Sequence, residues 1–157
     1  MIINIEKTVS NAFHHKHQVD CRVFYEKNQY GMSAAKFDRF VQSKGLSSIA
    51  GQWKEISYAE ARSIFIDLCS RSLCYGTEVM PTSKADFLAS QFFKYFNKQE
   101  SKYFTNFILD SYPSIINIYK LHNYASCHSL LPTSLLSIGI LSVNTEEIGL
   151  FVRGEWD

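Results

Sequence analysis

Two runs rich in apolar residues close the chain, at residues 137–143 and 148–153, and the polar segment 144–147 separates them. Apolar residues at every second position are typical of a strand with one buried face. The positions concerned are Leu136, Ile138 and Ile140 in the first run and Ile148, Leu150 and Val152 in the second. The pattern predicts an antiparallel hairpin that docks on the rest of the domain and keeps its charged tip outside.

Upstream of the hairpin, apolar residues recur every three or four positions, which predicts helices. The expected helices cover residues 2–17, 34–44, 58–75 and 83–96, with one more short helix over 101–109. Residues 21–25 fit a short strand or an extended entry, residues 45–56 fit a loop anchored by Trp53, and residues 114–124 fit a strand or a helix equally well.

Three helices carry signals at their ends. Ser57 followed by Glu60 predicts a capping box, in which each side chain satisfies a free backbone amide. Ser33 fits an N-cap, and Gly45 is a stop signal for the helix that follows Ser33. The helix at 83–96, capped by Thr82 or Ser83, is expected to bury Phe87, Leu88, Phe92, Tyr95 and Phe96.

These patterns predict an α+β fold, with a mainly helical body and a small C-terminal antiparallel β-hairpin or sheet. The 157 residues contain no repeat, low-complexity tract or linker, so we expect a single globular domain over residues 1–157.

Composition and charge narrow the classes of function. The chain is 46% hydrophobic and includes 12 Phe and nine Tyr, which suits a folded globule with an aromatic core or an aromatic protein-binding surface. Its 16 basic and 15 acidic residues give a net charge of +1. A protein that neutralises nucleic-acid phosphates normally has a basic surplus, so we expect no direct binding to nucleic acid.

The sequence gives no membrane or export signal. It contains no apolar run long enough to span a bilayer, and its N-terminus lacks the basic region and long apolar stretch of a signal peptide. The four Cys, at positions 21, 69, 74 and 127, show no disulfide spacing. These features predict a protein of the reducing cytoplasm.

His14, His17 and Cys21 are candidate metal ligands, since a helix would place the two imidazoles one turn apart with the thiol one turn further. A zinc site needs further ligands from a second segment, and no such pair stands out. Basic residues at a helix C-terminus also interact well with the helix dipole. We therefore assign no metal and no cofactor.

One segment contains side chains that could act in catalysis. Cys127 and His128, with His122 nearby, contain the atoms of a thiol protease, but a nucleophile and its base meet in space and not through adjacency in sequence. No Cys has a recognisable nucleophile context, and an inert, partly buried Cys explains this segment better. We assign no catalytic residue and expect no enzyme activity.

Acidic residues gather at the predicted tip and at the C-terminus. Glu146 and Glu147 lie where solvated charges normally occur, which makes them poor general acids and better contacts for a basic partner. Glu155 and Asp157 continue the acidic character, and Trp156 between them is either a core residue or an interface anchor.

The C-terminal third resembles small bacterial immunity proteins, the inhibitors of polymorphic and contact-dependent growth-inhibition toxins. The resemblance lies in the segments Ile138–Val143, Glu147–Val152 and Glu155–Asp157, with similar segments at Glu60–Arg62, Leu73–Glu78 and Tyr103–Asn106. One departure is the ending Arg153-Gly154-Glu155-Trp156-Asp157, where a denser run of acids is more typical of the family.

The resemblance implies a cytoplasmic protein that binds one cognate toxin domain, such as a nuclease, and occludes its active site or its docking surface. Glu146, Glu147, Glu155, Trp156 and Asp157 are the predicted partner-binding residues. A non-enzymatic adaptor or chaperone-type interaction domain, with an aromatic groove that also forms a homodimer, is the alternative. A small metalloprotein using His14, His17 and Cys21 is the third hypothesis.

Overall fold

The computed structural model describes residues 4–13, 18–72, 77–108, 126–127, 130–131 and 136–156. Its helices are α1 (Ile5–Ala12), α2 (Ala34–Ser43), α3 (Tyr58–Ser70) and α4 (Thr82–Phe93). Its strands are β1 (Gln18–Lys27), β2 (Lys54–Ile56), β3 (Lys102–Thr105), β4 (Phe107–Ile108), β5 (Ser126–Cys127), β6 (Leu136–Val143) and β7 (Glu147–Trp156).

A five-stranded antiparallel sheet, in the order β1-β7-β6-β3-β2, forms the centre of the fold. The predicted hairpin is confirmed: β6 pairs with β7 from Val143 opposite Ile148 to Leu136 opposite Glu155. β1 then pairs with the other side of β7 along ten residues, and β3 pairs with β6. The strands β4 and β5 form a separate two-stranded sheet.

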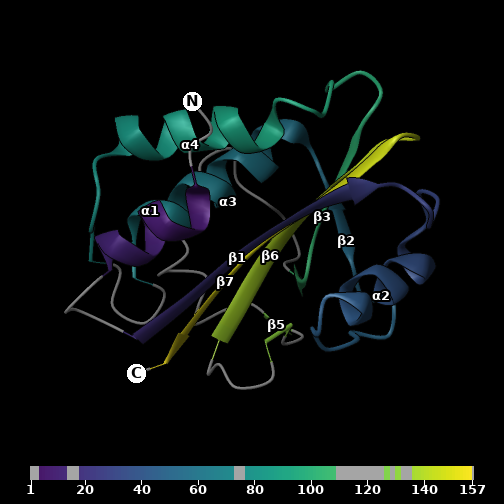
Figure 1. Cartoon of the computed structure of the whole chain (residues 1–157), viewed down its shortest axis with the longest axis horizontal. Helices are drawn as coiled ribbons and strands as arrows, with labels where there is room; N and C mark the ends of the chain where they lie inside the picture. Colours follow the sequence, from purple (N-terminus) through teal and green to yellow (C-terminus); the bar gives the residue numbers. More distant parts are fainter. Residues whose placement is uncertain are drawn as a thin grey trace.

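Both faces of the five-stranded sheet are buried (Figure 1). One face packs against α1, α3 and α4, and the other packs against α2 and the loop that follows it. Successive residues of β7 show the alternation, since Phe151 contributes to the first core and Leu150 and Val152 to the second. Because both faces are buried, the sequences of β6 and β7 are nearly continuous apolar runs.

The predicted mainly helical body with a small C-terminal sheet is wrong. The sheet extends across the chain, because β1 and β3 flank the hairpin on either side. Residues 101–109, predicted as a helix, instead contain β3 and β4. Tyr103 and Phe104 bury their rings in the two opposite cores, and four residues are too few for that alternation to stand out against a helical period.

The helix predictions hold in part. α1, α2 and α3 lie within predicted helices, and the capping box of Ser57 and Glu60 is confirmed. The predicted cap of α4 at Thr82 or Ser83 is wrong, because the helix begins at Thr82 and Pro81 is its N-cap. However, α3 ends at Ser70, because Arg71 is extended and bridges Glu78. Trp53 is buried as expected, yet the next three residues form β2.

Two aromatic residues predicted to be buried on α4 lie at the surface instead. Phe87 is 48% exposed and Tyr95 is 53% exposed, whereas Leu88, Phe92 and Phe96 are buried as expected. Tyr95 and Phe96 both follow the end of α4, where the helical period no longer determines which of the two side chains is buried.

Gly139 in β6 is required by close packing. A Cβ at this position would lie 2.8 Å from Cδ1 of Leu130 and 3.3 Å from the carbonyl oxygen of Phe151. Within the described residues, no helix has the length and apolar character needed to cross a bilayer.

Candidate protein-binding surface

The turn between β6 and β7, residues 144–147, is referred to as the tip. Its shape is set by the Asn144 side chain, whose Oδ1 accepts hydrogen bonds from the backbone N–H groups of Glu146 (2.9 Å) and Glu147 (2.7 Å). Asn is favoured in turns because its side chain can replace a backbone acceptor in this way. The Asn144 N–H also donates to the Glu147 carbonyl at 3.0 Å. The sequence therefore builds the tip locally.

A second asparagine, at the end of β1, holds the tip from the side. The Asn28 N–H donates to the Glu146 carbonyl at 2.9 Å, and its Nδ2 donates to the Asn144 carbonyl at 2.8 Å. The same Nδ2 contacts the Gly31 carbonyl at 2.9 Å. With its backbone held by two separate segments, the tip loses little conformational freedom when a partner binds.

The predicted acids at the tip differ in exposure. Glu146 is exposed, and Glu147 is half-buried. Glu147 is the register partner of Lys27, an exposed residue on β1, so a cation lies beside this acid. Glu146 is therefore the acid of the tip that is most available to a partner.

Two exposed aromatic residues lie near the tip. The Tyr95 ring packs edge-on against the Tyr25 ring with 5.5 Å between centroids, and Lys94 Nζ lies 5.0 Å from the Tyr95 ring centroid. Asn144 Nδ2 contacts the Tyr95 carbonyl at 3.4 Å, which joins this aromatic pair to the tip. Tyr25 is 38% exposed. Together, the tip, Tyr25 and Tyr95 combine an acid with aromatic anchors, as protein interfaces do.

Glu155, a predicted partner-binding residue, lies in the interior and is not available to a partner. Its side chain is fully buried and pairs with the buried Arg153 at 2.6 Å between Oε1 and Nη2. Ser72 Oγ donates to Glu155 Oε2 at 2.7 Å. This acid is thus satisfied within the fold.

Arg153 connects β7 to the end of α3. Its Nη1 donates to the carbonyls of Leu68 (3.2 Å) and Arg71 (2.8 Å), and its guanidinium carbon lies 4.3 Å from the centroid of the Phe13 ring. Burial lowers the pKa of Arg153, and the Glu155 carboxylate opposes that change. A cation at carbonyls freed by the end of a helix is favourable, which gives the pair a structural role.

Cys21 lies in β1, so its predicted place one helical turn beyond the two histidines is wrong. The thiol is buried, and burial raises its pKa well above the usual value, with Arg153 lowering it only in part. Metal binding favours the thiolate, which this environment opposes. Among the described residues, no group of three His, Cys, Asp or Glu side chains is placed to hold a metal.

Several candidate residues fall outside the part of the chain that the structure describes. They are His14, His17, His122, His128 and Asp157. For Trp156 and Cys127 the structure describes the strand but not the side chain. Their predicted roles stay predictions.

Sequence reasoning missed Tyr25, Tyr95 and the two asparagines. Asn144 could have been found, because Asn at the start of a polar break between two strands is a turn signal. The exposed tyrosines gave no usable signal, since both occur in apolar runs that otherwise pack into the core.

Comparison of this chain with protein-family models, with curated proteins and with solved structures gave no match. The resemblance to immunity proteins therefore stays a prediction.

Proposed function

We propose that this chain is an immunity protein, which binds a cognate bacterial toxin domain and neutralises it by covering its active site or a docking surface. The observation that carries the proposal is the braced tip, which holds the exposed Glu146 beside two partly exposed tyrosines. A rigid acid next to aromatic anchors suits a partner with a basic, partly apolar surface.

The expected mechanism is occlusion. A standard protein interface buries roughly 1,600 Å² in total, enough to cover the active-site cleft of a small domain. In such interfaces, aromatic residues near the centre supply most of the binding energy, and the charges at the rim speed association. Tyr95 and Tyr25 are suited to the first role and Glu146 to the second. If the toxin is a nuclease, its basic substrate channel is the complementary surface.

The test begins with purification of the tagged chain from the host that encodes it. We expect an equimolar partner that is the C-terminal fragment of a large secreted protein, and we expect this fragment alone to stop cell growth when expressed. Tyr95→Ala should weaken the purified complex by at least tenfold, whereas Phe87→Ala, an exposed aromatic on α4, should leave it unchanged. A partner that is not toxic would favour the adaptor hypothesis instead.

A further inference from the structure

The outer edge of β1 borders a pocket that the tip does not include. The pocket has a volume of about 270 Å³ and is lined by Asn4, Ile5, Glu6, Val23 and Tyr25, so it lies between the start of α1 and β1. β1 is an edge strand, because only β7 pairs with it in the five-stranded sheet.

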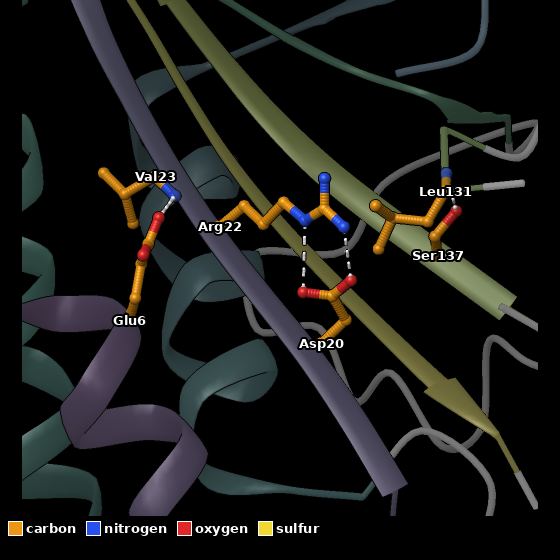
Figure 2. Close-up of polar contacts among 6 residues, drawn as sticks. All are labelled: Glu6, Asp20, Arg22, Val23, Leu131 and Ser137. Carbon is orange, nitrogen blue, oxygen red and sulfur yellow. Dashed lines mark hydrogen bonds and ion pairs between the residues drawn. The ribbon is translucent and has the colours of Figure 1, made fainter. Parts of the chain in front are cut away.

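Glu6 supplies the charge in this pocket. Its Oε1 accepts a hydrogen bond from the Val23 N–H at 2.6 Å, as Figure 2 shows. No described residue donates to the other carboxylate oxygen, and Glu6 is only half-buried. The carboxylate is thus held in position by one oxygen while the second can accept a hydrogen bond from a ligand.

The backbone of β1 adds further hydrogen-bonding groups at the edge of the sheet. In an antiparallel strand, the N–H and C=O of one residue point to the same side, and the side changes at each step. The Asn28 N–H points toward the Glu146 carbonyl, whereas the Val23 N–H points outward to Glu6. The pairing of β1 with β7 continues in regular register, so the Val23 carbonyl and both the N–H and the carbonyl of Tyr25 lie on the open edge.

These features favour a cation over an anion. The pocket is lined by a carboxylate and one aromatic residue, and two outward carbonyls and one outward N–H lie along its edge strand, so groups that interact well with a positive group predominate. The start of α1 contributes a positive partial charge of at most about half a unit, which the full negative charge of Glu6 outweighs. Asn4 Oδ1 is already used, since it accepts the Lys7 N–H at 3.0 Å.

We infer that this pocket receives a lysine or arginine side chain of the protein partner, whose main chain lies along the open edge of β1. The apolar stem would pack on Val23 and Tyr25, and the cationic group would pair with Glu6. This inference rests on the proposed function for its partner. The pocket is continuous with the proposed binding surface, because the Tyr25 ring contacts Tyr95, which borders the tip.

The test uses no toxin, so a failure of the pocket assignment can be distinguished from a failure of the proposed function. The probe is Nα-acetyl-arginine methylamide, titrated into the isotope-labelled chain while amide resonances are followed by NMR. We expect saturable shifts at Glu6, Val23 and Tyr25, and none with the uncharged norleucine analogue. Absence of saturation at these residues, or equal shifts with norleucine, would overturn the pocket assignment whether or not a toxin is found.

A variant pair tests the role of the charge. Glu6→Gln retains an oxygen that can accept the Val23 N–H but removes the charge, and we expect about tenfold weaker binding of the arginine probe. Glu55→Gln, at an exposed acid on β2 at the opposite edge of the sheet, should bind the probe like the wild type. Equal affinity of the Glu6→Gln variant and the wild type would refute the inference.

Discussion

Two arginine–carboxylate pairs with the same spacing lie on neighbouring strands and differ in burial and in their other hydrogen bonds. Arg153 and Glu155 on β7 are both fully buried, whereas the side chains of Arg22 and Asp20 on β1 are 42% and 22% exposed. Water screens the second pair and can replace its hydrogen bonds, but it cannot reach the first. The exposed pair therefore serves as a comparison for an ion pair that water can replace.

Removing the buried acid should be costly. We expect Glu155→Gln to lower the free energy of unfolding by about 3 kcal/mol or more, because it leaves the Arg153 charge buried without a counter-charge. Asp20→Asn should change the free energy by less than about 1 kcal/mol. Urea denaturation measures both, and equal changes in the two variants would contradict the structural role of the buried pair.

A half-buried pair between β1 and α2 should give a pH dependence. Burial raises the pKa of Glu26, but the hydrogen bond of Lys44, whose Nζ lies 2.7 Å from Glu26 Oε2, the Tyr30 side chain and the charge of Lys44 together lower the pKa below its ordinary value. A lowered folded-state pKa gives stability that is present above the unfolded-state value and is lost as the pH falls through the folded-state value.

We therefore expect the wild type to lose more stability than Glu26→Gln when the pH falls from 5 toward 3. Urea denaturation at several pH values in this range measures the difference. Parallel losses in the two proteins would show that Glu26 contributes nothing to the acid sensitivity of the fold.

At the scale of elements, the starts of α3 and α2 can be compared, because a Ser occupies the N-cap position of each helix. Ser57 Oγ accepts the Glu60 N–H at 3.1 Å, and Glu60 Oε1 accepts the Ser57 N–H at 2.8 Å. Ser33 occupies the same position before α2 but forms no side-chain cap.

Ser57→Ala should therefore lower the free energy of unfolding by about 1 kcal/mol, which is typical for loss of a cap. Ser33→Ala should have an effect close to zero, because no hydrogen bond is lost. Thermal or urea unfolding can compare the two exposed positions directly. An equal loss at Ser33 would show that the cap geometry does not determine the stability of these helices.

How far the sequence predicts these elements depends on how local their causes are. The capping box of α3 and the hairpin of β6 and β7 arise from contacts between residues close in the chain, and both were predictable. β3 is only four residues long and is stabilised by pairing with β6 and β2, which are distant in sequence. Its short pattern cannot be distinguished from a helical turn without those neighbours.

The same distinction between local and distant causes applies to the candidate surface. Glu146 follows from the turn between two strands, whereas the burial of Glu155 depends on Arg153, Ser72 and the end of α3, which only the folded chain brings together. The exposure of Tyr95 depends on where α4 ends, and no residue at that point gives a clear stop signal.

For the whole molecule, the arrangement of the sheet explains where a partner has access. Helices cover both faces of the sheet, as Figure 1 shows, so its strands are accessible at the tip and along the two edge strands, of which β1 ends beside the tip. The tip and the neighbouring tyrosines lie at one end of this edge. Surface charge there should govern association with a basic partner.

We expect the double variant Glu146→Lys and Glu147→Lys to slow association with the toxin domain about tenfold at low salt and to reduce the salt dependence of the rate. The control variant carries Glu55→Lys and Glu78→Lys, which change the net charge equally at exposed acids away from the tip. Stopped-flow or surface-based kinetics measures both. Equal slowing by the control would show that net charge, and not the tip, steers the partner.

The most direct test of the proposed function is protection of growth. Cells would express the toxin domain that co-purifies with this chain, either alone or together with the wild-type chain. We expect growth to stop with the domain alone and to resume when the wild-type chain is present at equal level. Growth that stays arrested in the presence of the folded, bound chain would contradict the assignment as an immunity protein.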